Sequence, residues 1–267
     1  MDAKKKNLLG VKLDAVDYSS AVELVMEAAQ AGRAFGVSAL AVHGVMTGVF
    51  DPVHRHRLNQ LELVVPDGQP VRWGLNLLHR VGLRDRVYGP NLMLKVCAAC
   101  AKQGLPIFLF GSTPDVMQHL VANLQAKFPE LRIAGHRVSR FRTMDASEKQ
   151  ELVEEIKQSG AKITFVGLGC PRQEVWAYEF KDDLSMPILA VGAAFAFHAG
   201  MLKQAPPLMQ RFGLEWLFRL GCEPLRLWKR YAFLNPYYLL LLFLQWTGIR
   251  RFDTSNTEAP THEILYG

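Results

Sequence analysis

The sequence predicts an α/β protein in which helices cover both faces of a mostly parallel sheet, followed by a helical appendage. Up to Val191, short apolar runs alternate with longer amphipathic stretches, which is typical of strands joined by helices. Beyond that point the alternation stops and only helical patterns follow. The repeated strand–helix order indicates a Rossmann-like sheet, whose ligands bind at the carboxyl ends of the strands.

Hydrophobic periodicity and capping residues place the individual elements. The short apolar runs predict strands over 8–13, 37–42, 61–65, 107–110, 131–134, 162–166 and 187–191. The amphipathic stretches predict helices over 19–30, 51–59, 71–81, 91–102, 114–127, 146–159 and 171–180. Asp17 or Ser19, Thr113 and Asp145 are the N-caps expected for three of these helices. In the appendage, helices are predicted over 208–220, 225–234 and 237–248.

Composition bounds the class of protein. The 267 residues, of which 49% are hydrophobic, suffice for one large domain with a full core and an appendage. We expect an α/β domain over 1–200, a helical appendage over 201–251, and a flexible tail over 252–267. Cys97 and Cys100 lie in an apolar helical stretch, which predicts buried thiols and fits a reducing, cytoplasmic setting.

The formal charge of +6 is concentrated in the appendage, where basic residues are interleaved with aromatic ones. This combination suits an anionic membrane surface as well as nucleic acid, and we rank nucleic acid last. The longest apolar run, over 237–246, has about half of the ~20 residues that a membrane-spanning helix needs. The sequence therefore predicts a segment that lies on a bilayer without crossing it.

The sequence F-V-G-L-G-C-P-R-Q-E, over 165–174, joins a predicted strand to a predicted helix that begins at its proline. Gly167 and Gly169 would let a ligand approach the backbone, and the helix N-terminus favours an anion. Arg172 and Gln173 add side-chain donors suited to a phosphate or a sugar. A glycine turn that only connects the strand to the helix explains these residue types equally well.

Other loops that follow strands carry candidate functional residues. Asp67 is either the N-cap of the next helix or a general base at the rim of a cleft. Arg86 could contact a phosphate, or pair with Asp85 in solvent. Gly111 and Ser112 form a small turn before a helix, which suits ribose or phosphate.

No metal or other cofactor is expected from this sequence. No cluster of histidine and cysteine has metal-ligand spacing, and no Asp-x-Asp pair is present for a nucleotide-bound cation. His198, which lies between apolar residues, is expected to be structural and neither a base nor a ligand.

A series of motifs occurs in a fixed order along the chain: P-D-G-Q-P-V, D-R-V-Y-G-P-N-L, F-V-G-L-G-C-P-R-Q-E-V-W, H-A-G and G-L-E-W-L-F-R-L-G-C-E-P-L-R-L-W-K-R-Y. Together they resemble the WecG/TagA/CpsF family of glycosyltransferases over 8–231. The resemblance implies an inverting, metal-independent enzyme that transfers a sugar from a UDP-sugar to a polyprenyl-diphosphate-linked glycan. It also implies that the enzyme acts in the synthesis of a bacterial exopolysaccharide or surface polysaccharide, on the inner face of the cell membrane.

The resemblance also implies roles for single residues. Asp67 would be the catalytic base, Arg86 would contact the diphosphate or the sugar, and Gln173 would contact the donor sugar. Three arginines of the appendage would close over the diphosphates: Arg219, Arg226 and Arg230. The remaining candidates for substrate contacts are His43, Asn91, Gly111, Ser112, Gly167, Gly169 and Arg172. The sequence is compatible with a homo-oligomer.

The sequence departs from the family pattern where the family usually has polar or charged residues: Ala39 and Ala41 replace the ends of T-x-N, Ala196 and Asn91 replace aspartates, and Gln204 replaces the arginine of R-A-P. His43 is a candidate to supply the polar contact that the two alanines of the first motif lack. The substitutions fit a subfamily with altered donor or acceptor choice. They also fit a catalytically impaired scaffold that binds a nucleotide or a lipid diphosphate on the same fold.

Overall fold

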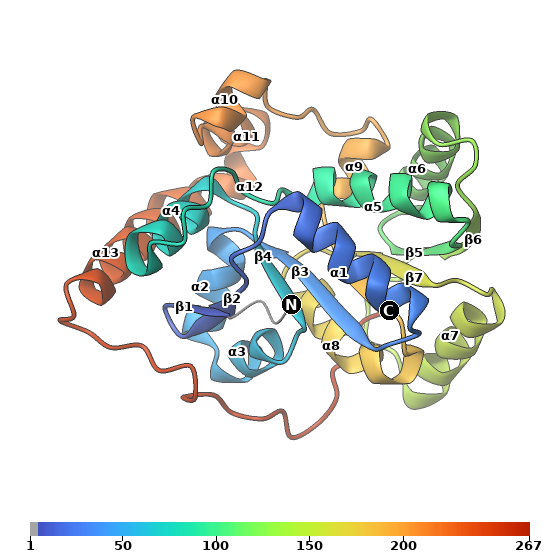
Figure 1. Ribbon diagram of the computed structural model, residues 1–267, viewed down its shortest axis with the longest axis horizontal. Coiled ribbons are helices and arrows are strands. Elements are labelled where there is room, and N and C mark those ends of the chain that lie inside the picture. The colour runs from blue at the N-terminus through green and yellow to red at the C-terminus, as the bar shows by residue number, and fades with distance from the viewer. Residues whose placement is uncertain (1–4) are drawn as a thin grey trace.

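A parallel sheet of six strands in the order β4-β3-β8-β7-β5-β6 forms the centre of the molecule (Figure 1). The computed structural model describes residues 5–267, without the side chains of Pro207, Arg226, Lys229 and Arg230. The strands are β3 (Phe35–Leu40), β4 (Leu63–Pro66), β5 (Ile107–Gly111), β6 (Ile133–Arg137), β7 (Ile163–Gly167) and β8 (Pro187–Ala190). The predicted α/β class with a parallel sheet is therefore confirmed.

Helices cover both faces of the sheet. One face carries α1 (Tyr18–Gln30), α5 (Gly89–Gln103), α6 (Pro114–Lys127) and α9 (Ala194–His198). The other carries α2 (Val42–Phe50), α3 (Pro52–Asn59), α4 (Gln69–His79), α7 (Ala146–Gln158) and α8 (Arg172–Leu184). Each face has its own hydrophobic core, so the strands other than the edge strand β6 are buried on both sides and their sequences read as largely apolar runs. Cys97 and Cys100 are buried in the first core, as predicted.

The predicted caps hold three of the helices at their N-termini. Asp17, and not Ser19, caps α1, because its carboxylate accepts a hydrogen bond from the backbone of Ser20 at 2.9 Å. Thr113 caps α6, and Asp145 caps α7 in a reciprocal capping box with Glu148.

The structure differs from the predicted elements by one to four residues at many boundaries, and also in the following features. The single strand expected over 8–13 is a hairpin of β1 (Lys6–Leu8) and β2 (Val11–Leu13), turned by Leu9 and Gly10 at positive φ. Helix α2 was not predicted, because it follows β3 closely and is too uniformly apolar to show a polar face. Helix α8 begins at Arg172, and the preceding proline is its N-cap.

The C-terminal region is helical, as predicted, with different boundaries. Its elements are α10 (Pro207–Arg211), α11 (Glu215–Cys222), α12 (Pro224–Lys229), a π-helical turn (Arg230–Leu234) and α13 (Asn235–Trp246). The helix expected over 208–220 is interrupted at Gly213, whose φ is +71°. Helix α13 lies against α4, where the Tyr238 hydroxyl donates a hydrogen bond to the carbonyl of Pro70 at 2.9 Å. Within residues 5–267, no helix combines the length and apolar character needed to cross a bilayer.

The segment 252–267, predicted to be a flexible tail, packs against the α/β body. It runs back from α13 across the molecule (Figure 1). Near its end, Leu265 is buried, and its carbonyl accepts a hydrogen bond from the backbone of Met144 at 2.7 Å. This end of the chain is therefore part of the packed structure.

Candidate active site

The strand order opens a crevice between β5 and β7. The chain leaves these neighbouring strands in opposite directions, toward β6 and toward β8, which is the arrangement at which open α/β sheets bind ligands. Gly111 and Gly167 end the two strands side by side. A Cβ at Gly111 would lie 2.9 Å from the Gly167 backbone, and one at Gly167 would lie 2.6 Å from the Phe195 ring. Glycine at both positions therefore lets the two strand ends and the Phe195 ring pack closely.

A cleft of about 380 Å³ follows the carboxyl edge of the sheet, and we call it the inner cleft. It extends from Asp67, after β4, to Phe141, beyond β6. Between them it is lined by the backbone of Gly167 and Gly169 and by Ser112. Residues from loops far apart in the sequence therefore share one cleft, as the parallel sheet requires.

A second cavity, of about 120 Å³, lies between the α/β body and the C-terminal helices, and we call it the outer cavity. His43, Arg86 and Trp216 contribute to its walls. The residues that line both spaces are few: Ala41, Asp67, Tyr88 and Arg219. Asp67 contributes the one carboxylate among these four, so the two spaces meet at this group.

The carboxylate of Asp67 is held by the first residue of α5. Its Oδ1 accepts a hydrogen bond from the backbone of Gly89 at 2.7 Å. The N-cap alternative for Asp67 is wrong, since Gly68 occupies that position and α4 has no side-chain cap. Burial raises the pKa of Asp67 to about 6, against the opposing effects of Arg86 and the Gly89 hydrogen bond. A carboxylate with this pKa is ionised at neutral pH and close to the range suited to a general base.

Arg86 is buried and forms an ion pair with Glu215 in the first turn of α11. Its guanidinium also lies over the ring of Tyr88, 4.4 Å from the ring centre. The alternative pairing with Asp85 is wrong for the side chain, because Asp85 accepts a hydrogen bond from the backbone of Arg86 instead. Sequence reasoning missed Glu215. The available signal was its position as one of few acids in a basic segment.

The side chain of Gln173 is directed into the protein and braces the glycine turn. Its Oε1 accepts a hydrogen bond from the backbone of Gly169 at 3.2 Å, and its Nε2 donates to Glu174 at 2.8 Å. The same oxygen of Glu174 accepts from the Ser38 hydroxyl at 3.1 Å. Both side chains are buried, and burial raises the pKa of Glu174. Gln173 and Glu174 together therefore link the turn after β7 to Ser38 of β3.

The family model described as Glycosyl transferase WecG/TagA/CpsF family matches residues 6–252. The chain belongs to this glycosyltransferase family. The match covers the sheet, the inner cleft, the outer cavity and all the C-terminal helices, so the site described above lies within the matched region. Membership supports transfer of a sugar in surface polysaccharide synthesis, with a nucleotide-sugar donor and a glycan acceptor.

The structure brings some of the other predicted residues of this glycosyltransferase to the two spaces. Ser112, Gly167 and Gly169 line the inner cleft, His43 lines the outer cavity and Arg219 lines both. Gly111 lies beneath them against the backbone of β7. The three alanines that replace polar residues of the family pattern also face the inner cleft: Ala39, Ala41 and Ala196.

Besides Gly111, two more of the predicted residues lie outside both spaces. Asn91 is exposed, and its side-chain amide donates to the Tyr18 hydroxyl at 3.5 Å. Arg172 lies over the ring of Tyr266, 5.5 Å from the ring centre, on the side of the C-terminal segment. The side chains of Arg226 and Arg230 lie outside the described residues. Over the part of the chain that is described, no group of three or more histidine, cysteine or acidic residues is arranged to hold a metal ion.

Proposed function

We propose that this glycosyltransferase is an inverting hexosyl- or N-acetylhexosaminyltransferase. Its donor is a UDP-sugar and its acceptor is a polyprenyl-diphosphate-linked glycan of a bacterial exopolysaccharide or surface polysaccharide. The observation that carries the proposal is the position of Asp67, a carboxylate with a pKa of about 6 where the inner cleft meets the outer cavity. A base at this junction can reach an acceptor in one space and a donor sugar in the other.

The proposed reaction is a single displacement. The acceptor hydroxyl attacks the anomeric carbon while Asp67 takes its proton, and the bond from that carbon to the diphosphate breaks on the opposite face, which inverts the configuration. The charge that develops on the leaving UDP is stabilised by the N-terminus of α8 and by those backbone N–H groups of the turn over 167–173 that are not, like those of Gly169 and Gln173, hydrogen-bonded within the turn. Arg219, which lines both spaces, adds a positive charge.

Gln173 supports this mechanism through the turn. Because its amide is hydrogen-bonded to Gly169 and Glu174, it positions the backbone against which the donor is proposed to lie. A direct contact of Gln173 with the donor sugar, which the family resemblance implies, would add to this positioning effect.

The outer cavity suits the acceptor, because its walls combine arginines with aromatic rings. Arg86 and Arg219 would contact the acceptor diphosphate, and Trp216 would contact the glycan or the first part of the lipid. The ion pair of Arg86 with Glu215 lies beside the same space, so the acceptor would bind next to the joint between the body and the C-terminal helices.

The outward face of α13 suits a membrane surface. Its buried side chains, Tyr238, Leu241 and Leu242, face the body, yet its outward side is also apolar. We call this outward side the apolar face of α13, and its members are Leu239, Leu240, Phe243 and Trp246. An exposed apolar face beside basic residues is typical of helices that lie in the headgroup region. We therefore propose a peripheral association with the inner face of the cell membrane.

The experiment that tests the reaction uses the purified protein with a panel of UDP-sugars and a membrane lipid extract, and identifies the glycolipid product by mass. Asp67→Asn should lower the transfer rate by about 10²- to 10⁴-fold and retain donor binding, since loss of a general base has effects of this size. Asp115→Asn, an exposed carboxylate on α6, is the matched control and should transfer at the wild-type rate. Near-normal transfer by Asp67→Asn would rule out this assignment.

A second candidate function is supported by the alanines of the inner cleft. Ala39, Ala41 and Ala196 remove polar groups from the proposed donor site, which favours a scaffold that binds the donor without turnover. An assay of UDP binding, glycolipid formation and UDP-sugar hydrolysis distinguishes the two functions. A scaffold would bind UDP but yield neither a glycolipid product nor slow hydrolysis of any UDP-sugar, whereas an enzyme would yield at least one of the two.

A further inference from the structure

The last residues of the chain extend beyond the family match, which ends at residue 252. We call the segment over 253–267 the C-terminal strap. It passes from the side of α13 back across the molecule (Figure 1) and ends beside the loop that joins β6 to α7. This loop, over 138–145, forms one end of the inner cleft through Phe141.

The strap pairs with this loop through backbone hydrogen bonds. Thr143 and Tyr266 form an antiparallel bridge. The backbone of Met144 donates to the carbonyl of Leu265 at 2.7 Å, and the backbone of Gly267 donates to the carbonyl of Arg142 at 2.8 Å. Because Leu265 is also buried in the core, the strap is anchored where it meets the loop.

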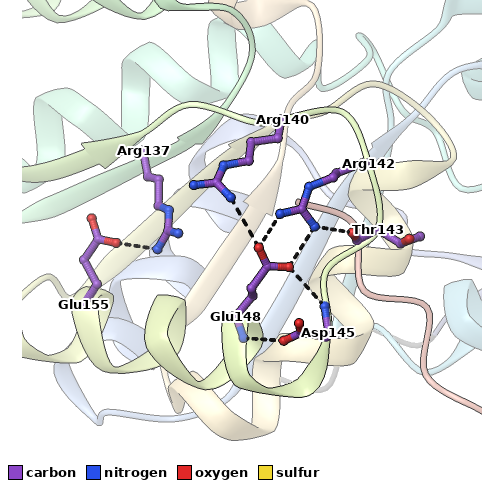
Figure 2. Close-up of polar contacts among 7 residues, drawn as sticks. All are labelled: Arg137, Arg140, Arg142, Thr143, Asp145, Glu148 and Glu155. Carbon is purple, nitrogen blue, oxygen red and sulfur yellow. Dashed lines mark hydrogen bonds and ion pairs between the residues drawn. The ribbon is translucent and has the colours of Figure 1, made fainter.

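Helix α7 holds the same loop from its other side. Arg140 and Arg142 both pair with the carboxylate of Glu148 in the first turn of α7 (Figure 2). Glu148 also accepts a hydrogen bond from the backbone of Asp145, as part of the capping box. The loop is therefore bound on two sides, by the strap and by α7.

Phe141, at the tip of this loop, has an unusual conformation. Its φ is +54°, a region that residues with bulky side chains rarely adopt. Phe141 is 46% exposed and contributes to the wall of the inner cleft. Strained backbone of this kind persists only where the surrounding structure enforces it, and it is concentrated at ligand-binding sites.

One buried hydroxyl connects Phe141 to the strap. Ser139 Oγ accepts a hydrogen bond from the backbone of Phe141 at 2.9 Å. The same hydroxyl donates to the carbonyl of Gly267, the last residue of the strap, at 2.6 Å. The Ser139 hydroxyl thus links the backbone of Phe141 to Gly267 of the strap.

We propose that the Phe141 ring stacks on the base of the donor nucleotide and that the C-terminal strap holds it in position to do so. The inference rests on the proposed function, in which the inner cleft binds a UDP-sugar. With the sugar at Asp67, after β4, and the diphosphate at the glycine turns of β5 and β7, the base extends toward β6, where Phe141 lies. An exposed aromatic ring at that end offers a planar surface to a planar base.

The test compares UDP with inorganic pyrophosphate, which lacks the base, by isothermal titration calorimetry on the full chain. Phe141→Ala should weaken UDP binding about tenfold, in the range typical of base–aromatic stacking. It should leave pyrophosphate binding unchanged, and Phe141→Tyr should bind UDP as the wild type does. Phe50→Ala, which removes a ring of similar exposure at the far end of α2, is the matched control and should bind both ligands normally.

A double-mutant cycle tests the strap as a positioning element. Ser139→Ala should weaken UDP binding several-fold when Phe141 is present and have no further effect in the Phe141→Ala background, because the hydroxyl acts through the ring. Pyrophosphate binding should not change. Equal effects of Ser139→Ala in both backgrounds would overturn the role of the strap.

The outcomes separate this inference from the proposed function. If the wild type binds UDP and Phe141→Ala binds it equally well, the stacking contact is wrong while the donor class stands. If the wild type binds pyrophosphate but does not bind UDP more tightly, or binds neither, the UDP donor of the proposed function is itself contradicted, and the stacking contact with it.

Discussion

The ion pair between Arg86 and Glu215 joins the loop before α5 to the first turn of α11, next to the proposed catalytic carboxylate. Both side chains are largely buried. The C-terminal helices contribute to the core as well, since Leu227, Tyr238 and Leu241 are almost fully buried. The body and the C-terminal helices are therefore tied together at the site. Removal of all residues after 200 would also expose buried parts of the body, so single substitutions are the cleaner test of what the helices do.

We predict that Arg86 and Glu215 stabilise the fold cooperatively. Replacing each by alanine, alone and together, should give a coupling free energy of about 1–3 kcal/mol, because loss of one partner leaves the other charge poorly solvated. Urea unfolding followed by tryptophan fluorescence measures it. The exposed pair of Arg137 with Glu155 (Figure 2) is the control and should give roughly 0.2–1 kcal/mol. Equal coupling for the two pairs would contradict the prediction.

The rate should depend on pH through Asp67. Its pKa of about 6 means that the base is protonated below that pH and ionised above it. We expect kcat/KM to rise tenfold per pH unit below about 6 and to level off above it, because only the ionised carboxylate accepts the acceptor proton. The residual kcat/KM of Asp67→Asn should not show this rise. A rise with the same midpoint in the variant would show that another group causes the pH dependence.

The same raised pKa predicts a pH-dependent change in stability. Because the pKa of Asp67 in the folded protein exceeds the unfolded value of 3.8, folding favours its protonated form. That stabilisation is complete below the unfolded pKa and is lost as the pH rises through about 6. Between pH 4 and pH 8, the free energy of unfolding of Asp67→Asn should therefore increase by about 1–3 kcal/mol relative to that of the wild type. Urea unfolding at the two pH values measures it, and a constant difference would refute it.

We predict that transfer does not require a divalent metal ion. In the proposed mechanism, the charge of the leaving UDP is stabilised by the backbone of the turn over 167–173, the N-terminus of α8 and Arg219. Transfer should therefore continue in excess EDTA at close to its initial rate. Loss of activity in EDTA with recovery in magnesium or manganese would show that the mechanism is wrong.

Membrane association should depend on the apolar face of α13. Leu240→Glu combined with Phe243→Glu should release the protein from vesicles that contain anionic lipid, because each substitution would place a charge in the headgroup boundary. Gln125→Glu, an exposed position on α6, is the control for added charge and should leave sedimentation with vesicles unchanged. Arg219→Ala should lower transfer and remain vesicle-bound. Unchanged vesicle binding of the double variant would exclude this face as the membrane contact.

The sequence by itself was sufficient for the strands of the main sheet, most of the helices that cover it and the family. Apolar runs mark the strands that are buried on both sides, which β6 is not, and caps such as Thr113 and Asp145 act on backbone groups within a few residues. Asp67 and the turn at Gly167 could be selected for a related reason. Loops that follow strands gather at one edge of a parallel sheet, whatever the order of the strands.

Only the tertiary structure determined which of these loops meet. The junction of the two cavities at Asp67 depends on the position of α11 beside the loop that follows β4, and no local pattern encodes that contact. The pairing of Arg86 with Glu215 joins residues far apart in the chain, and so does the contact of Ser139 with Gly267. Periodicity and capping depend on neighbours within a few residues, whereas these contacts depend on strand order and on where the end of the chain packs.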